Sequence, residues 1–97
     1  MRRDEALAIL RAHAEELRST FGVGALSLFG SVARDEAGAE SDVDVLVEFA
    51  GSETFATYMD LKLFLEDRFG RRVDLVTAEG LRPRVRPYVE RDLIRVA

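Results

Sequence analysis

The stretch that decides the fold is residues 25–49, which have the sequence ALSLFGSVARDEAGAESDVDVLVEF. It contains two apolar runs of strand length, and the pair Gly30-Ser31 follows the first run directly. Ten residues separate this pair from Asp42, which alternates with valines and with Asp44 at the start of the second run. Because alternate side chains of a strand share a face, both carboxylates are expected on one side and the valines on the other. The stretch therefore predicts a strand, a tight turn with a short helix, and a second strand whose outer face is mostly acidic.

The turn between the two predicted strands has the residue types that hold phosphate. Gly30 permits close approach to the backbone, and Ser31 offers a hydroxyl and a backbone N–H at a helix start. Arg34 lies one turn further on, where its guanidinium is within reach of triphosphate oxygens. Gly30, Ser31 and Arg34 are therefore the predicted nucleotide-binding residues.

The acidic face predicts a metal site. Asp42 and Asp44 are two residues apart, so their Cα atoms lie roughly 6.5 to 7 Å from each other. Like charges about 4 Å apart repel by roughly 4 kcal/mol at an effective dielectric near 20, which favours either raised pKa values or a bound divalent cation. Oxygen ligands favour Mg²⁺, with Mn²⁺ as the alternative. Asp74, on a third predicted strand at residues 72–77, is the expected third ligand if that strand lies beside the second.

These three aspartates are also the predicted catalytic residues. A nucleotidyl transfer needs cations that orient the triphosphate and activate the attacking hydroxyl, together with a general base. Asp42, Asp44 and Asp74 supply carboxylates for both tasks, and geometry decides which of them takes the proton.

The flanking sequence predicts helices. Apolar residues at steps of three and four indicate one helix from Asp4 to Thr20 and another from Glu53 to Phe69. In the less regular tail, Pro83 is expected to open a final helix, with Pro87 in its first turns.

The expected fold class is α/β (α+β), a small mixed sheet of three to four strands with helices packed on one face. A chain of 97 residues suffices for one such unit, so residues 1–97 are expected to form a single domain.

Composition narrows the function classes. The formal net charge of −4 argues against direct nucleic-acid binding. Without cysteines and without an apolar stretch long enough for a signal peptide or a membrane span, a cytoplasmic protein with no membrane role is expected. Charge is unevenly distributed, since residues 35–61 hold eight acidic and no basic residues whereas residues 68–97 hold eight arginines. This pattern fits either ordinary solvated surface or an acidic metal cleft beside an arginine-rich face for phosphate or a partner.

The segments GSVAR at 30–34 and SDVD at 41–44 together resemble the signature of the polymerase-β-type nucleotidyltransferase superfamily. In a chain of about 100 residues they are similar, more narrowly, to the minimal nucleotidyltransferase (MNT) proteins, the antitoxins of two-gene systems whose partner is a helical HEPN ribonuclease toxin. The resemblance implies a polymerase-β-like nucleotidyltransferase fold and an enzyme that uses ATP. It implies transfer of AMP to a tyrosine hydroxyl of the toxin, which silences it.

The resemblance also assigns roles: Asp42, Asp44 and Asp74 bind magnesium, Gly30 and Ser31 hold the triphosphate of ATP, and Arg34 matches the arginine of the family. Many relatives place glycine after this arginine, whereas this chain has Asp35-Glu36, which implies a more acidic entrance to the phosphate turn.

Two alternatives to a protein adenylyltransferase remain open from the sequence. One is a non-catalytic antitoxin that neutralises its partner by stoichiometric binding through the arginine-rich tail. The other is a nucleotidyltransferase acting on a small molecule, although a chain this short has little room for an acceptor pocket of its own. For the same reason, a partner protein is expected to complete the active site.

Overall fold

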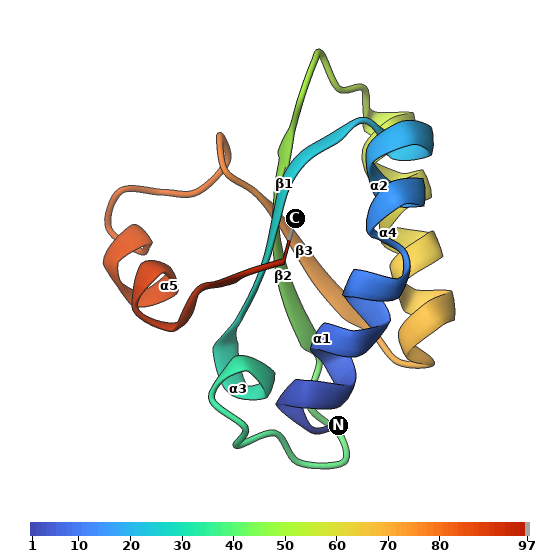
Figure 1. The fold of residues 1–97 in the computed structure, drawn as a ribbon. Helices are drawn as coiled ribbons and strands as arrows, with labels where there is room; N and C mark the ends of the chain where they lie inside the picture. The colour runs from blue at the N-terminus through green and yellow to red at the C-terminus, as the bar shows by residue number, and fades with distance from the viewer. Residues whose placement is uncertain (97) are drawn as a thin grey trace.

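A four-stranded sheet forms the centre of the protein in a computed structural model that describes residues 1–96 (Figure 1). Its strands, in the spatial order β3-β2-β1-β4, are β3 (Val73–Thr77), β2 (Val43–Phe49), β1 (Val23–Phe29) and β4 (Ile94–Arg95). Strand β1 is antiparallel to both β2 and β4, whereas β2 and β3 are parallel. The predicted mixed sheet is therefore confirmed.

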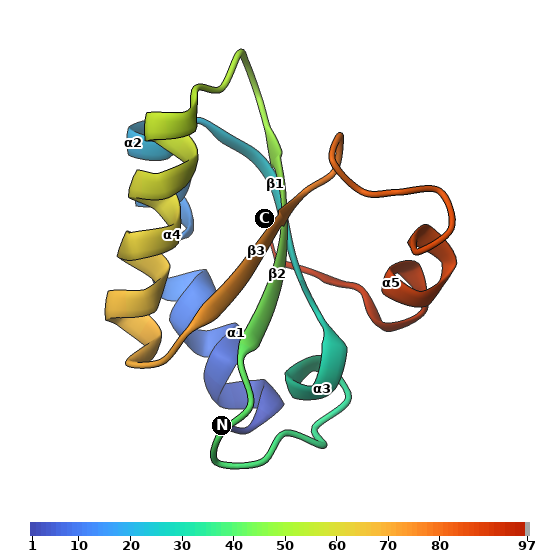
Figure 2. The ribbon, with the colours of Figure 1, turned by 180° about the vertical axis from the view of Figure 1, so that it is seen from behind.

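The three longest helices cover one face of the sheet. They are α1 (Arg3–Ala12), α2 (Ala14–Phe21) and α4 (Phe55–Phe69), and both views place them on the same side of the strands (Figures 1 and 2). The alternation of β2 explains this arrangement, because Val43, Val45 and Val47 are completely buried. Leucines from the helices, Leu17, Leu61 and Leu65, pack into the same core. Burial of one such side chain contributes about 1.5 to 3 kcal/mol.

Helix α4 makes the crossover that parallel strands require. It begins at Phe55, two residues later than expected, because the Thr54 side chain caps the helix by accepting a hydrogen bond from the Thr57 N–H at 3.1 Å. It ends at Gly70, whose φ of 67° suits glycine. The crossover returns the chain to β3 beside β2, which sets the register of the two acidic strands.

The prediction of one continuous helix from Asp4 to Thr20 is wrong, because the helix breaks at His13. The His13 N–H donates to the carbonyl of Leu10, three residues back, at 3.2 Å, and its φ and ψ are −108° and 11°. A tighter bond of this kind interrupts the helical ladder and bends the axis. The two segments, α1 and α2, both bury leucine side chains in the common core.

The C-terminal segment differs from the prediction at its start. Helix α5 (Arg86–Asp92) contains Pro87 in its first turn, as expected. Pro83 does not open it, because the Arg82 carbonyl accepts from the N–H groups of both Val85 and Arg86 and so forms a separate turn. After α5 the chain returns to the sheet as β4.

Helix α5 stands on the other side of the sheet from α4 (Figures 1 and 2). It contacts the short helix α3 (Gly30–Ala33), which follows β1. The face of the sheet that carries the aspartates is thus bordered by α3 and α5, not covered by a long helix. Within residues 1–96, no helix has the length and apolar character needed to cross a membrane.

Candidate active site

The Gly-Ser turn lies directly against an aspartate. Strand β1 ends at Phe29, Gly30 turns with a φ of 75°, and α3 begins. A Cβ atom at Gly30 would be only 2.1 Å from Oδ2 of Asp44. Both the left-handed backbone and this close approach therefore require glycine. The phosphate-type turn and the acidic strand, ten residues apart in sequence, form one continuous surface.

Two of the predicted site aspartates are neighbours across the parallel strands. The register of β2 and β3 pairs Asp44 with Asp74, so the expected adjacency of the third strand is confirmed. Asp44 is half-buried, whereas Asp74 is exposed. Burial raises the pKa of Asp44 to about 6, and the negative charges of Asp74 and Asp42 add to this effect. Negative charge is therefore concentrated at Asp44, where a cation would relieve it.

Asp42, the remaining predicted ligand, lies one residue before β2 and forms an ion pair with an arginine. Its Oδ1 atom is 3.5 Å from Nε of Arg72, which immediately precedes β3. Among residues 1–96, no three His, Cys, Asp or Glu side chains are already arranged as a metal-binding group. The carboxylates are hard oxygen donors that fit a divalent cation, and Asp42 also has Arg72 as a competing partner. Sequence reasoning missed Arg72 as a member of this cluster.

Arg34, the predicted phosphate-binding cation, is already paired with two carboxylates. Its Nη1 atom donates to Asp92 of α5 at 2.7 Å, and its Nε donates to Glu36 at 3.2 Å. These bonds, that with Asp92 foremost, raise the pKa of the guanidinium. The contact with Asp92 joins residues 58 positions apart, and no local pattern in the sequence pointed to it.

Asp35 does not make the entrance to the turn as acidic as expected. Its carboxylate accepts a hydrogen bond from the Arg3 backbone N–H at 2.9 Å and one from Nη2 of Arg2 at 3.2 Å, so it caps the start of α1. The Arg3 N–H bond is the main cause of the lowered pKa of Asp35. Its φ of 60° is a left-handed conformation, which glycine adopts without strain.

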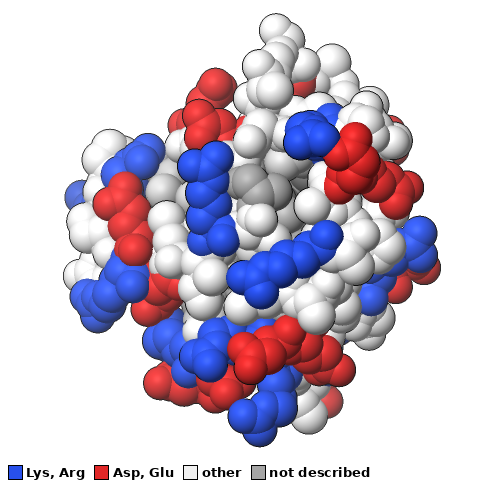
Figure 3. Space-filling view, viewed as in Figure 1, with Lys and Arg blue, Asp and Glu red and all other residues white. Residues whose placement is uncertain are grey.

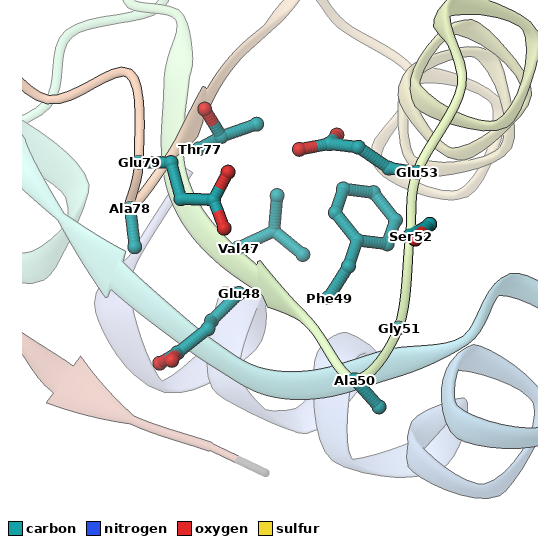
Figure 4. A pocket seen from close by; sticks show the side chains of 10 residues that line it. All are labelled: Val47, Glu48, Phe49, Ala50, Gly51, Ser52, Glu53, Thr77, Ala78 and Glu79. Atoms are coloured by element: carbon teal, nitrogen blue, oxygen red, sulfur yellow. The ribbon is translucent and has the colours of Figure 1, made fainter.

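A separate hollow of about 550 Å³ lies at the far end of β2 from these residues (Figure 4). Its wall starts at Val47, about 10 Å along the strand from Asp44. The side chains of Glu53 and Glu79 point into it, and none of the described residues that line it is Lys or Arg. An acidic hollow repels a triphosphate, so this hollow is a poor candidate for the nucleotide site.

The uneven charge of the sequence does not produce a continuous basic surface on the side shown in Figure 3, where Lys and Arg alternate with Asp and Glu. Several arginines of the second half have acidic partners, as in Arg68 with Asp67, Arg72 with Asp42 and Arg86 with Glu90. On this side, the simpler interpretation of mixed, solvated charge holds.

A strand that delivers Gly-Ser to the side of two acidic strands is the arrangement of a nucleotidyltransferase. Residues 10–96 match the family model described as "Nucleotidyltransferase domain", and the chain belongs to this family. Within the family it is a minimal nucleotidyltransferase of the protein adenylyltransferase type, as two similar proteins indicate. The predicted family, fold and enzyme class are thereby confirmed.

The similarity extends over nearly the whole chain. The protein adenylyltransferase MntA of Thermococcus cleftensis is 40% identical over 93 residues, which are 96% of this chain and 94% of that protein. The solved structure of a candidate minimal nucleotidyltransferase has a TM-score of 0.80 and 41% identity, and it covers 97% of this chain and 95% of that one. The fold also matches a solved complex of a tri-AMPylated Shewanella oneidensis HEPN toxin with its MNT antitoxin, at a TM-score of 0.68, 17% identity and 94% and 71% coverage. Use of a nucleotide substrate and a divalent metal is general in the family.

Proposed function

We propose that this chain is an antitoxin that transfers AMP from ATP, with Mg²⁺, to a tyrosine hydroxyl of a HEPN toxin. The observation that carries the proposal is the contact of Gly30 with Asp44, which itself lies beside Asp74. This contact places a phosphate-type turn and two carboxylates within one small site. The match to MntA over nearly the full length supports protein adenylylation, and the fold of the HEPN-bound antitoxin supports the partner.

In this proposal the turn binds the triphosphate. Gly30 allows the phosphates to approach the backbone, and the Ser31 hydroxyl donates to a phosphate oxygen. The Arg34 guanidinium offsets the negative charge of the departing pyrophosphate. Together these groups hold the nucleotide so that its α-phosphorus lies beside the aspartates.

Asp42, Asp44 and Asp74 hold the metal in this proposal. Mg²⁺ would neutralise triphosphate charge and lower the pKa of the attacking hydroxyl. Asp74 is exposed and accessible from solvent, so we assign it the contact with the incoming hydroxyl. The hydroxyl oxygen forms a bond to the α-phosphorus, the bond to the bridging oxygen breaks, and pyrophosphate leaves. The proton of the hydroxyl passes to a carboxylate of the cluster.

The partner supplies the other wall of the site. The open face is bordered by α3 and α5 and has no further domain in the described residues to bind an acceptor (Figure 1). Because this face is open, we propose that the toxin itself presents the tyrosine to Asp74. We further propose that residues 1–97 act as one domain in the cytoplasm.

The test combines this chain with a candidate HEPN toxin, α-labelled ATP and Mg²⁺. Label is expected on the toxin with the wild-type chain and with the Asp60→Asn control, which changes an exposed carboxylate on α4. It should be lost with the double variant Asp42→Asn/Asp44→Asn. Label that persists unchanged in the double variant would sink the proposed mechanism.

A second function, neutralisation by binding alone, is favoured by one observation. Asp42 and Arg34 are already held by Arg72 and Asp92, so two site residues have partners within the chain itself. If toxin activity is still suppressed by the double aspartate variant, this stoichiometric function replaces the catalytic one.

A further inference from the structure

The guanidinium of Arg34 is held on two of its edges. Asp92 accepts from Nη1 at 2.7 Å and Glu36 accepts from Nε at 3.2 Å. Because a guanidinium has five N–H donors in a rigid plane, these two bonds fix its orientation and leave three donors for a ligand. Arg34 is therefore a restrained cation that still has hydrogen-bonding capacity.

The restrained cation lies at the proposed nucleotide site. The Arg34 N–H donates to the Gly30 carbonyl at 3.1 Å, so its backbone closes the turn that follows β1. Arg34 is the C-terminal cap of α3, which contacts both the acidic strand β2 and α5. It therefore lies at the junction of the phosphate turn with these two elements.

Asp92 is the stronger of the two anchors. Its side chain is only 14% exposed, whereas that of Glu36 is 67% exposed, and a charge-assisted bond gains strength as water is excluded. Asp92 is also the last residue of α5, where the helix dipole disfavours an acidic side chain. Its placement is therefore not explained by the stability of α5, but it is explained by the bond to Arg34.

We propose that Asp92 is a positioning residue for nucleotide binding, which holds the Arg34 guanidinium at the phosphate turn before ATP arrives. The inference rests on the proposed function, because it takes Arg34 as a contact of the triphosphate. Without Asp92 the long side chain of Arg34 is free to rotate, and ordering it on binding costs about 0.5 to 1.5 kcal/mol. The C-terminal helix thereby sets the geometry of a site formed by the first half of the chain.

The test is calorimetric titration of the full chain with ATP and Mg²⁺. The Asp92→Ala variant is expected to bind about two- to twelvefold more weakly, which is the ordering cost converted to a dissociation constant. Asp92→Asn retains an oxygen acceptor and should recover part of the loss. Glu90→Ala is the matched control, because it removes a carboxylate from the same helix, one that pairs with Arg86 on the surface, and should bind as the wild type does.

A double-mutant cycle with Arg34→Ala separates positioning from a general structural effect. If Asp92 acts through Arg34, then Asp92→Ala has no further effect on ATP binding in the Arg34→Ala chain. Additive losses would overturn the inference, and so would tighter ATP binding by Asp92→Ala, since the carboxylate would then compete with phosphate. If Arg34→Ala alone leaves binding unchanged, the assignment of Arg34 in the proposed function fails instead. Should Asp92→Ala unfold, the cycle is run with Asp92→Asn, whose equal loss in both backgrounds would also overturn the inference.

Discussion

Asp44 is predicted to destabilise the metal-free protein at neutral pH. Its pKa is raised from 3.8 to about 6, mainly by burial. At about 1.36 kcal/mol per pKa unit the shift corresponds to roughly 3 kcal/mol for a fully shielded group. Asp44 is half-exposed, so solvent screening reduces this to about 1 kcal/mol. Asp44→Asn should therefore stabilise the protein by about that amount once the wild-type carboxyl is ionised.

The sign of the pH dependence follows from the direction of the shift. The folded protein holds the Asp44 proton more tightly than the unfolded chain does. The stabilisation that comes from protonated Asp44 is therefore complete below about pH 4 and is lost as pH rises through about 6. In EDTA, Asp44→Asn should raise Tm by about 4 to 8 °C at pH 8 and by about half as much at pH 5, measured by circular dichroism. Asp60→Asn, on the exposed side of α4, is the control and should change little at either pH. A lower Tm for Asp44→Asn at pH 8, or an equal rise at both pH values, would refute the reasoning.

Three further substitutions test other contacts of the site. Gly30→Ala introduces a Cβ 2.1 Å from Oδ2 of Asp44 at a φ of 75°, so it should lower stability by about 1 to 2 kcal/mol and abolish ATP binding, as thermal unfolding and titration would show. Unimpaired ATP binding would mean that the turn does not approach the phosphates. At Asp35, the alanine variant should lower Tm more than the glycine variant does. Both variants lack the carboxylate that caps α1, but only alanine is strained by the left-handed φ of 60°. A lower Tm for the glycine variant would contradict this role of the backbone. Arg72→Gln frees Asp42 and should increase Mn²⁺ affinity about two- to threefold, measured by electron paramagnetic resonance, whereas weaker binding would show that Arg72 orients Asp42 for the metal.

The parts of the fold that depend on local pattern were predictable. Alternation at Val43, Val45 and Val47 gave the two-faced strand, and glycine at position 70 ended the long helix where expected. The break at His13 was not predictable, because the apolar period continues across it and only one hydrogen bond changes. The fourth strand, β4, was not predictable as a strand at a given place, because two residues are too few to show an alternating pattern.

The candidate site was also predictable only in part. The neighbours Asp44 and Asp74 were predictable because each occupies the outer position of a strand and the connecting helix makes the strands parallel. The partners of the charged side chains were not predictable, because Arg72 contacts Asp42 across the strands and Asp92 contacts Arg34 from the other end of the chain. Such ion pairs depend on tertiary placement, about which spacing in the sequence gives no information.

The position of β3 in the sheet affects how an acceptor can approach. With the order β3-β2-β1-β4, β3 forms an edge of the sheet, and Asp74 lies on that edge while Gly30 lies further in, at the end of β1. A nucleotide bound at the turn would therefore leave the lateral approach to Asp74 clear. Entry from the side sets no upper limit on the size of the acceptor, so a folded protein can present a hydroxyl there as readily as a small metabolite.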